Sequence, residues 1–343
     1  MDGSHELGAE PPRRIRIAGL GRYLPTRVVT NAELEARFAL EPGWILAHNG
    51  VGERRRADVD AGETATWMAA AAAREALDEA GLAATDLDLI VNASGTPEQA
   101  IPDGAALVQR HLGLGRSGVP CFSVHATCLS FCVALDVVAS LVAAGRHRRV
   151  LVVSSDIGSA SVVGVDAASE TLWGDAAAAA VVVPSAPGQP SALHRARQHT
   201  WSDGAELTEV RGCGTRLHPG RPGATADDLR FVMRGPEVLR LSLRMARPFL
   251  ADLLPGFETQ GCEGIDVVVP HQPSLAGLDA LQALGVPRDR TVVTLAELGN
   301  CVAASMPCSL YEATRTGALR RGHRALLIGT GAGLSMAGAV LTY

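Results

Sequence analysis

The segment His125-Ala-Thr-Cys-Leu-Ser-Phe-Cys132 places one cysteine, Cys128, at the point where a short apolar run gives way to a helical pattern. The N-terminus of a helix offers unpaired N–H groups and about half a positive charge. Such a position favours the thiolate, so we expect a lowered pKa for the Cys128 thiol and a nucleophile able to carry an acyl group. A buried structural cysteine produces the same pattern, and this segment alone leaves the role of Cys128 open.

Two later segments end in groups that could assist a thiol. Val267-Val-Val-Pro-His271 places an imidazole at the end of an apolar strand, where open α/β sheets carry their sites. Gly299-Asn300 forms a turn before a helical pattern, and its amide could donate to an enolate oxygen. Alone, His271 is better explained by a loop hydrogen bond, and Asn300 by a helix cap or a left-handed turn residue. Together with Cys128 they form the nucleophile and donors that acyl transfer requires, so we predict these three as the catalytic residues.

The alternation of apolar and helical segments predicts an α/β fold of two similar halves. We expect a flexible tail over residues 1–13, a half carrying the nucleophile over 14–183, and a half carrying His271 and Asn300 over 192–343, with a Pro/Gly/Ser-rich connection between the halves. The sheet of the first half is expected to be mostly parallel. The expected helices span 62–80, 102–112, 129–144, 237–254, 275–284 and 303–316, and the expected strands span 14–20, 87–93, 119–124, 150–154, 177–183, 265–269, 291–294, 325–328 and 337–341.

Composition excludes several classes of function. The net charge of −5 gives a nucleic-acid partner no electrostatic support, and no apolar run approaches the roughly 20 residues needed to cross a bilayer. Seven cysteines without a CxxC spacing indicate free thiols, a reducing cytoplasm and no metal site. All 31 basic residues are arginine, so no lysine can form a Schiff base, and we expect no bound cofactor.

Six ordered motifs between residues 15 and 341 resemble those of the ketoacyl-synthase III group of thiolase-fold condensing enzymes. They are Trp44-Ile-Leu-Ala-His48-Asn-Gly-Val-Gly-Glu-Arg-Arg55, Ser123-Val-His-Ala-Thr-Cys128, Leu172-Trp-Gly-Asp175-Ala-Ala, Pro270-His271-Gln272, Gly299-Asn300-Cys-Val-Ala-Ala-Ser-Met-Pro307 and Gly331-Ala-Gly-Leu334. The resemblance implies a five-layered αβαβα fold and a homodimer. It also implies that Cys128 accepts an acyl group from a coenzyme A or acyl-carrier-protein thioester.

The same resemblance assigns further roles. His271 and Asn300 would assist decarboxylation of a malonyl-type extender, while the backbone N–H groups of Cys128 and Ala332 would form the oxyanion hole. Trp44 and Arg240 fall at positions that bind the thioester carrier. Ile101 falls where a dimer partner's side chain enters the acyl pocket.

Four positions depart from the family pattern. His48, Ala167 and Ala276 stand where the family has arginines, and Ser274 stands where it has an asparagine. The lost cation contacts imply altered recognition of the thioester carrier. The departures therefore point to a condensing enzyme of polyketide or other natural-product assembly rather than of fatty-acid initiation.

Two other functions remain open from the sequence. One is transfer of the acyl group to an oxygen or nitrogen nucleophile, or to another carrier, without decarboxylation. The other is a non-catalytic subunit, which the presence of all three predicted catalytic residues disfavours. A nucleotide loop at Gly329-Thr-Gly331-Ala-Gly333 is set aside, because a strand rather than a helix follows it. His125 could line the acyl pocket or pack beneath it.

Overall fold

The computed structural model describes residues 11–161 and 166–343. Most of the predicted tail, residues 1–10, lies outside the described residues. Arg13, at its end, is held in place: its backbone pairs with Leu193 and its guanidinium pairs with Asp136 and Ser140. Arg13, which the prediction placed in the flexible tail, is therefore fixed to the body of the molecule.

Each half of the chain builds one large sheet. The first sheet has the strand order β1-β7-β6-β4-β5 and the second has the order β11-β12-β13-β8. The strands of the first sheet are β1 (Ile15–Tyr23), β4 (Leu89–Asn92), β5 (Cys121–Ser123), β6 (Val150–Ile157) and β7 (Asp175–Pro184). Those of the second are β8 (Ala192–Thr200), β11 (Val267–Pro270), β12 (Arg324–Gly331) and β13 (Ser335–Thr342).

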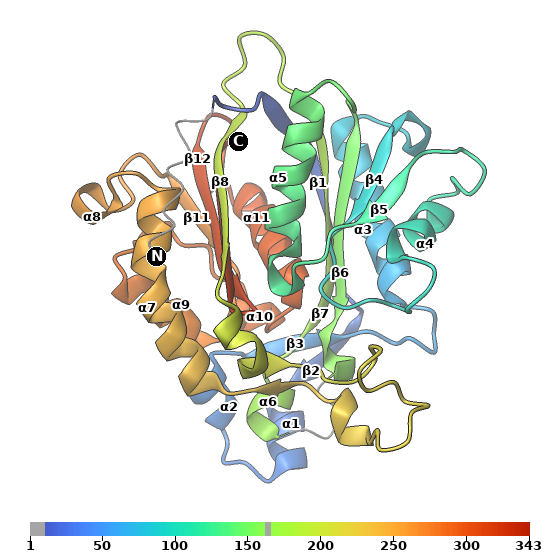
Figure 1. Cartoon of the computed structure of the whole chain (residues 1–343), viewed down its shortest axis with the longest axis vertical. Helices are drawn as coiled ribbons and strands as arrows, with labels where there is room; N and C mark the ends of the chain where they lie inside the picture. The colour runs from blue at the N-terminus through green and yellow to red at the C-terminus, as the bar shows by residue number, and fades with distance from the viewer. Residues whose placement is uncertain (1–10, 162–165) are drawn as a thin grey trace.

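Helices cover both faces of both sheets, which gives five layers. The middle layer is α5 (Ser130–Ala143) and α11 (Ser305–Arg315), which stand between the two sheets in Figure 1. The outer layers are α3 (Ala65–Ala80) with α4 (Gly104–His111) on the first sheet, and α7 (Gly235–Leu253) with α9 (Leu275–Ala283) on the second. One hydrophobic core joins the inner faces of both sheets to the middle helices. The predicted αβαβα fold is confirmed.

Small elements close one end of the layers around a further hydrophobic cluster. They are β2 (Arg27–Thr30), α1 (Asn31–Phe38), α2 (Trp44–Asn49), β3 (Glu53–Arg56), α6 (Ala167–Glu170), β9 (Thr208–Glu209), β10 (Val232–Met233) and α10 (Leu295–Leu298). The short helix α8 (Phe257–Gln260) lies apart from this end and packs beside α7. No helix in the described part of the chain is long and apolar enough to cross a membrane.

Close packing explains the alanine-rich pattern of α3. A Cβ atom on Gly21 would lie 2.1 Å from the carbonyl oxygen of Ala72, and one on Gly19 would lie 2.2 Å from that of Ala76. Small residues on both surfaces therefore let α3 lie directly against β1, and each face would clash if it carried larger side chains.

The prediction of a mostly parallel first sheet is wrong. β7 runs antiparallel to both β1 and β6, while β4 runs parallel to β5 and β6. In its described residues, the segment between β6 and β7 holds only the short helical turns Gly158–Ser161 and α6. A parallel neighbour requires a crossover long enough to cover the sheet, whereas a short connection allows an antiparallel one.

The second half differs from expectation at two places. The expected strand at 291–294 is a single bridge from Thr291 to Val268, and Thr294 already precedes α10. Strand β8 was not expected, because it carries Arg195, Arg197 and His199 where a buried strand carries apolar residues. These three side chains bind Asp252 of α7, which satisfies the charges on an edge strand.

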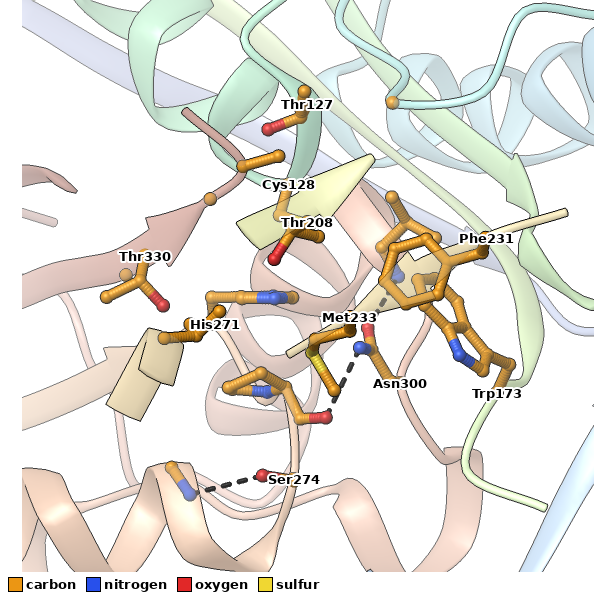
Figure 2. A pocket seen from close by; sticks show the side chains of 18 of the residues that line it. Thr127, Cys128, Trp173, Thr208, Phe231, Met233, His271, Ser274, Asn300 and Thr330 are labelled. Carbon is orange, nitrogen blue, oxygen red and sulfur yellow. Dashed lines mark hydrogen bonds between the residues drawn. The ribbon is translucent and has the colours of Figure 1, made fainter. Parts of the chain in front are cut away.

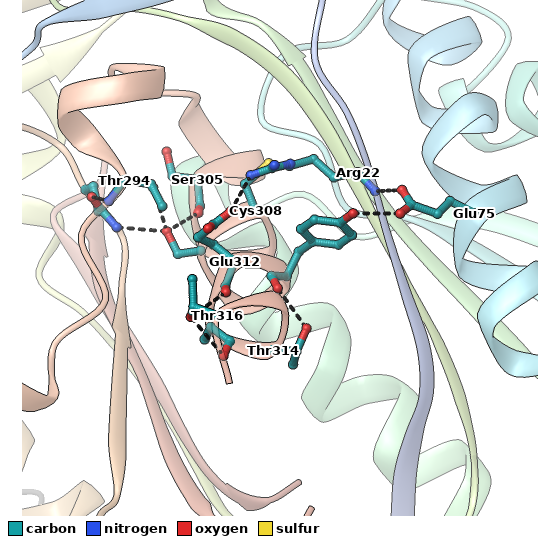
Figure 3. A network of polar contacts seen from close by, with 12 residues as sticks. Arg22, Glu75, Thr294, Ser305, Cys308, Glu312, Thr314 and Thr316 are labelled. Carbon is teal, nitrogen blue, oxygen red and sulfur yellow. Dashed lines mark hydrogen bonds and ion pairs between the residues drawn. The ribbon is translucent and has the colours of Figure 1, made fainter. Parts of the chain in front are cut away.

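Helix α11 is bonded to both halves of the molecule (Figure 3). Toward the first half, Glu312 pairs with Arg22 of β1 at 3.0 Å, and the Tyr311 hydroxyl donates to Glu75 of α3 at 2.7 Å. Toward the second half, the Ser309 hydroxyl contacts that of Thr294 at 2.9 Å. The helix thereby fixes the two sheets relative to one another.

Candidate active site

Cys128, His271 and Asn300 line one cavity of about 1230 Å³ (Figure 2). Cys128 lies in the 3₁₀ turn Thr127–Leu129 that leads into α5, His271 directly follows β11, and Asn300 follows α10. The structure therefore brings together the three residues that the sequence places far apart, and their catalytic roles stay predictions.

The turn that holds Cys128 is packed tightly against the second sheet. Thr127 has the left-handed φ of 51° that the sharp turn requires. A Cβ atom on Gly331 of β12 would lie 2.8 Å from Thr127 Oγ1 and 3.1 Å from Leu129 Cγ. Glycine at position 331 lets the strand approach the turn that holds Cys128.

The expected lowering of the Cys128 pKa is wrong for the resting site. Burial, followed by the nearby Asp156 carboxylate, raises the pKa of Cys128 to about 12. A backbone N–H in the turn acts in the opposite direction and is the weaker effect. The helix α5 begins only at Ser130, so its first turn is not centred on the sulfur, and desolvation decides the sign.

Asp156 is a buried carboxylate that joins the two sides of the cavity. It accepts hydrogen bonds from the N–H groups of Gly95 and Thr96 and from the Thr96 hydroxyl, at 2.7–2.8 Å. Its other oxygen accepts from the N–H of Ala304, 3.1 Å away, in the turn that follows Asn300. Burial raises the pKa of Asp156 to about 6, against the effect of these hydrogen bonds.

His271 is neutral at pH 7, because burial lowers its pKa to about 4. Its backbone N–H donates to the carbonyl of Ile328 on β12 at 2.8 Å. Among the described residues, its Nδ1 is buried without a hydrogen-bond partner, so Nε2 is the ring nitrogen available to the cavity. A neutral imidazole with a proton on Nε2 is a hydrogen-bond donor to a substrate oxygen.

Gln272 anchors the segment that carries His271. Its amide nitrogen donates to the Val292 carbonyl and the Ser309 hydroxyl, at 3.1 and 2.8 Å. Its amide oxygen accepts from the N–H groups of Thr294 and Leu295, both at 2.8 Å. A buried amide with all these partners is held in one orientation, which fixes the loop after β11.

The Asn300 amide is oriented by its neighbours. Its oxygen accepts from the N–H of Val302 at 2.9 Å, and its nitrogen donates to the Pro273 carbonyl at 3.3 Å. Figure 2 shows both bonds and the nitrogen on the side of His271. The second N–H of Asn300 is thus the donor that faces the cavity, next to the imidazole.

The other predicted site residues divide into two groups. Ala332 and Ser274 line the cavity, and the Ser274 hydroxyl also caps α9 by accepting from the N–H of Gly277 at 3.2 Å. Trp44, His48, Arg240 and Ile101 are not among the described residues that line it. His48 stacks on Trp44, with ring centroids 4.1 Å apart, and Ile101 is 86% exposed.

Sequence reasoning missed the residues that cover the cavity. Thr208 and Met233 of the small β9–β10 hairpin, and Phe231 directly before β10, lie over the predicted catalytic side chains in Figure 2. Phe231 packs edge-on against Trp173, with ring centroids 4.9 Å apart. Both strands are two residues long, too short for a periodic pattern. The one available signal is the apolar run Phe231-Val232-Met233 between Arg230 and Arg234.

Comparison with known proteins places this site in a family. Residues 122–200 match the model of 3-oxoacyl-[acyl-carrier-protein (ACP)] synthase III, and residues 260–343 match the model of its C-terminal region. The chain is 36% identical over 335 residues to the beta-ketoacyl-[acyl-carrier-protein] synthase III of Methylococcus capsulatus, covering 96% of this chain and 99% of that relative. The chain belongs to the 3-oxoacyl-[acyl-carrier-protein] synthase III family. The resemblance to thiolase-fold condensing enzymes is therefore confirmed.

Solved structures of this family agree. The synthase III of Aquifex aeolicus VF5 superposes with a TM-score of 0.84 at 32% identity, over 96% of this chain and all of that one (100%). The priming β-ketosynthase from the R1128 polyketide biosynthetic pathway superposes with a TM-score of 0.81 at 30% identity, over 98% of each chain. This chain is therefore about equally similar to a synthase III and to a polyketide priming ketosynthase.

The raised thiol pKa predicts how Cys128 responds to pH. Because most of the thiol stays protonated far above neutrality, we expect its alkylation by iodoacetamide to be slow at pH 7 and to rise about tenfold per pH unit up to pH 9.5. Peptide mass spectrometry of Cys128 after timed labelling measures the rate, with glutathione as the reference thiol. A plateau below pH 8 would show that the helix start outweighs burial.

Proposed function

We propose that this synthase III homologue forms an acyl thioester on Cys128 and condenses it with a malonyl-type thioester, with loss of carbon dioxide. The observation that supports this proposal is the pair of neutral donors, His271 and Asn300, beside Cys128 in one cavity. Two fixed donors suit the enolate oxygen that forms on decarboxylation. Transfer to an oxygen or nitrogen nucleophile would need a base and has no use for the second donor.

In the first step the Cys128 thiol adds to the carbonyl of the donor thioester. Its proton passes to the departing sulfur, which leaves as a free thiol, and Cys128 keeps the acyl group. The backbone N–H groups of Cys128 and Ala332 would hold the negative oxygen of the tetrahedral intermediate.

In the second step the bond between the malonyl carboxylate and C2 breaks, and carbon dioxide leaves. The electron pair forms an enolate, whose oxygen would accept hydrogen bonds from His271 and Asn300. The enolate carbon attacks the acyl carbonyl, a carbon–carbon bond forms, and Cys128 departs as a thiolate that takes up a proton. Low polarity in the cavity strengthens both donor contacts while the charge exists.

The donor we propose is an acyl-coenzyme A or acyl-carrier-protein thioester, and the setting we propose is natural-product assembly. Support comes from the relatives, whose names include a carrier-protein synthase and a polyketide priming enzyme. It also comes from Ala276 and His48, which stand at positions where the family has arginines. Intact-mass measurement of the acyl-enzyme across a thioester panel, with carbon dioxide release from malonyl thioesters, tests the proposal; an acyl-enzyme that decarboxylates none of them would contradict it.

We further propose that the enzyme is a homodimer. Strand β5 forms one edge of the first sheet, and among the described residues it pairs only with β4. Phe122 on this strand is 37% exposed, and Ile101, two residues before the Asp103 carboxylate that Ser123 of β5 binds, is 86% exposed. Exposed strand edges with apolar side chains are usually covered, and a second copy would cover this one.

The dimer proposal predicts that a substitution on β5 lowers the molecular mass of the protein in solution from that of a dimer to that of a monomer. Phe122→Asp should convert the dimer to monomers in analytical ultracentrifugation, because a carboxylate would be buried at the interface without a partner. Val293→Asp is the matched control, since Val293 is 49% exposed and lies away from β5. A monomeric parent protein at micromolar concentration would overturn the proposal.

A further inference from the structure

The cavity is much larger than a short acyl group and a malonyl unit need, and its lining falls into three groups. One group surrounds Cys128 and includes Thr96, His125 and Ile157. A second lies at the β9–β10 hairpin and Asn300. The third group lies between α7 and α9, over the outer face of the second sheet, and neither the predicted catalytic residues nor the predicted carrier contacts account for it.

This third group, here called the α7–α9 branch, is apolar. Its walls are Leu243, Ala246 and Phe249 on α7 and Leu281 on α9, and its floor is Ile328 and Met336 of the second sheet. The lining part of α7, from Leu239 to Phe249, is about 15 Å long at the helical rise of 1.5 Å per residue. The branch is therefore long as well as apolar.

Small side chains keep the branch open. Ala246 of α7 and Ala280 of α9 both line it, where larger residues would bring the helix surfaces into contact. Ala246 is buried, whereas Ala280 is partly exposed. In Figure 1, α7 and α9 lie beside one another on the same side of β11 and β12.

The branch begins beside His271. Its floor residue Ile328 accepts the hydrogen bond from the His271 backbone N–H at 2.8 Å. The group around Cys128 comes from other segments, the turn at Thr96 and the end of β6 near Ile157. The α7–α9 branch thus opens on the side of His271, the proposed donor to the extender's enolate, and not on the side of Thr96 and Ile157.

We propose that the α7–α9 branch binds an alkyl substituent on C2 of a malonyl-type extender. This inference rests on the proposed condensation and names the substrate class for it. A carrier's pantetheine arm fits the branch poorly, because Ser242 is the one polar side chain that α7 and α9 contribute to this lining, and two buried amides would lack partners. A hydrocarbon chain gains from every methylene that it buries there.

The experiment compares binding of two amide analogues by calorimetry, the cysteamine amides of malonate and of 2-octylmalonate. The parent enzyme should bind the octyl analogue at least about tenfold more tightly. Ala280→Phe should remove that preference, since the ring fills the branch. Ala283→Phe is the matched control, because Ala283 is exposed on the same helix outside the lining, and it should leave the preference and the activity unchanged.

Two results would overturn the inference: no preference in the parent enzyme, or an equal loss of preference in the Ala280→Phe and Ala283→Phe variants. Thermal melting checks that both variants fold. Carbon dioxide release from the corresponding thioesters is measured separately. If binding follows the expectation and neither thioester is decarboxylated, the proposed condensation fails while the assignment of the branch stands.

Discussion

An Asn300→Ala variant should still be acylated on Cys128 but should lose about 10²–10³-fold in condensation, the usual effect of removing one donor to a developing oxyanion. The Asn300 nitrogen is the donor that faces the cavity, since the oxygen is occupied by Val302. The two steps are measured separately, by intact mass for the acyl-enzyme and by carbon dioxide release for the condensation.

Asn300→Asp is the conservative partner of this variant. It keeps an oxygen for the Val302 N–H and removes the donor, so it should lose condensation to a similar extent without disturbing the turn. Cys128→Ala is the negative control for acylation. If Asn300→Ala kept full activity with an oxygen or nitrogen acceptor, transfer without decarboxylation would be the better description, since no enolate needs stabilising.

A Gly174→Ala variant should be destabilised by about 3 kcal/mol or more, or fail to fold, because overpacking against rigid backbone is among the costliest substitutions. A Cβ atom on Gly174 would lie 1.8 Å from the carbonyl oxygen of Leu298. The Gly174 N–H also donates to the Asn300 carbonyl at 3.0 Å, so relief of the clash would displace Asn300. Denaturant unfolding followed by circular dichroism measures the loss.

Gly115→Ala is the control for this effect. Nothing lies within 4 Å of a Cβ atom at Gly115, which is exposed, so this variant should match the parent protein in stability. Equal midpoints for the Gly174 and Gly115 variants would mean that the segment at Leu298 can move away at little cost, and the tight placement of Asn300 would then lose its support.

Helices whose apolar residues recur at helical spacing, and which end at a glycine, were predictable from the sequence. Residues 62–80 and 129–144 were expected as helices, and α3 and α5 lie there. Strand β8 was not expected, because its charged residues are satisfied by Asp252 of a helix distant in sequence. Strand direction was also missed, since it depends on how a connection crosses the sheet and not on the pattern within a strand.

For the site, residue types and order were enough to nominate Cys128, His271 and Asn300. Their electrostatics were not predictable in the same way. The helix start next to Cys128 is visible in the sequence and predicts a lowered thiol pKa. Burial and the charge of Asp156, which raise that pKa, arise only when distant segments pack around the sulfur. The β9–β10 cover and the α7–α9 branch depend likewise on side chains from several elements and leave no contiguous pattern.

The bonds of Asp156 have a consequence for redesign of this enzyme. One oxygen holds the loop of Gly95 and Thr96, which lines the cavity near Cys128, and the other holds Ala304 behind the Asn300 turn. A backbone shift on either side must therefore be accommodated on the other. Substitutions that change donor preference and extender preference will be non-additive, and libraries should vary the two regions jointly rather than in succession.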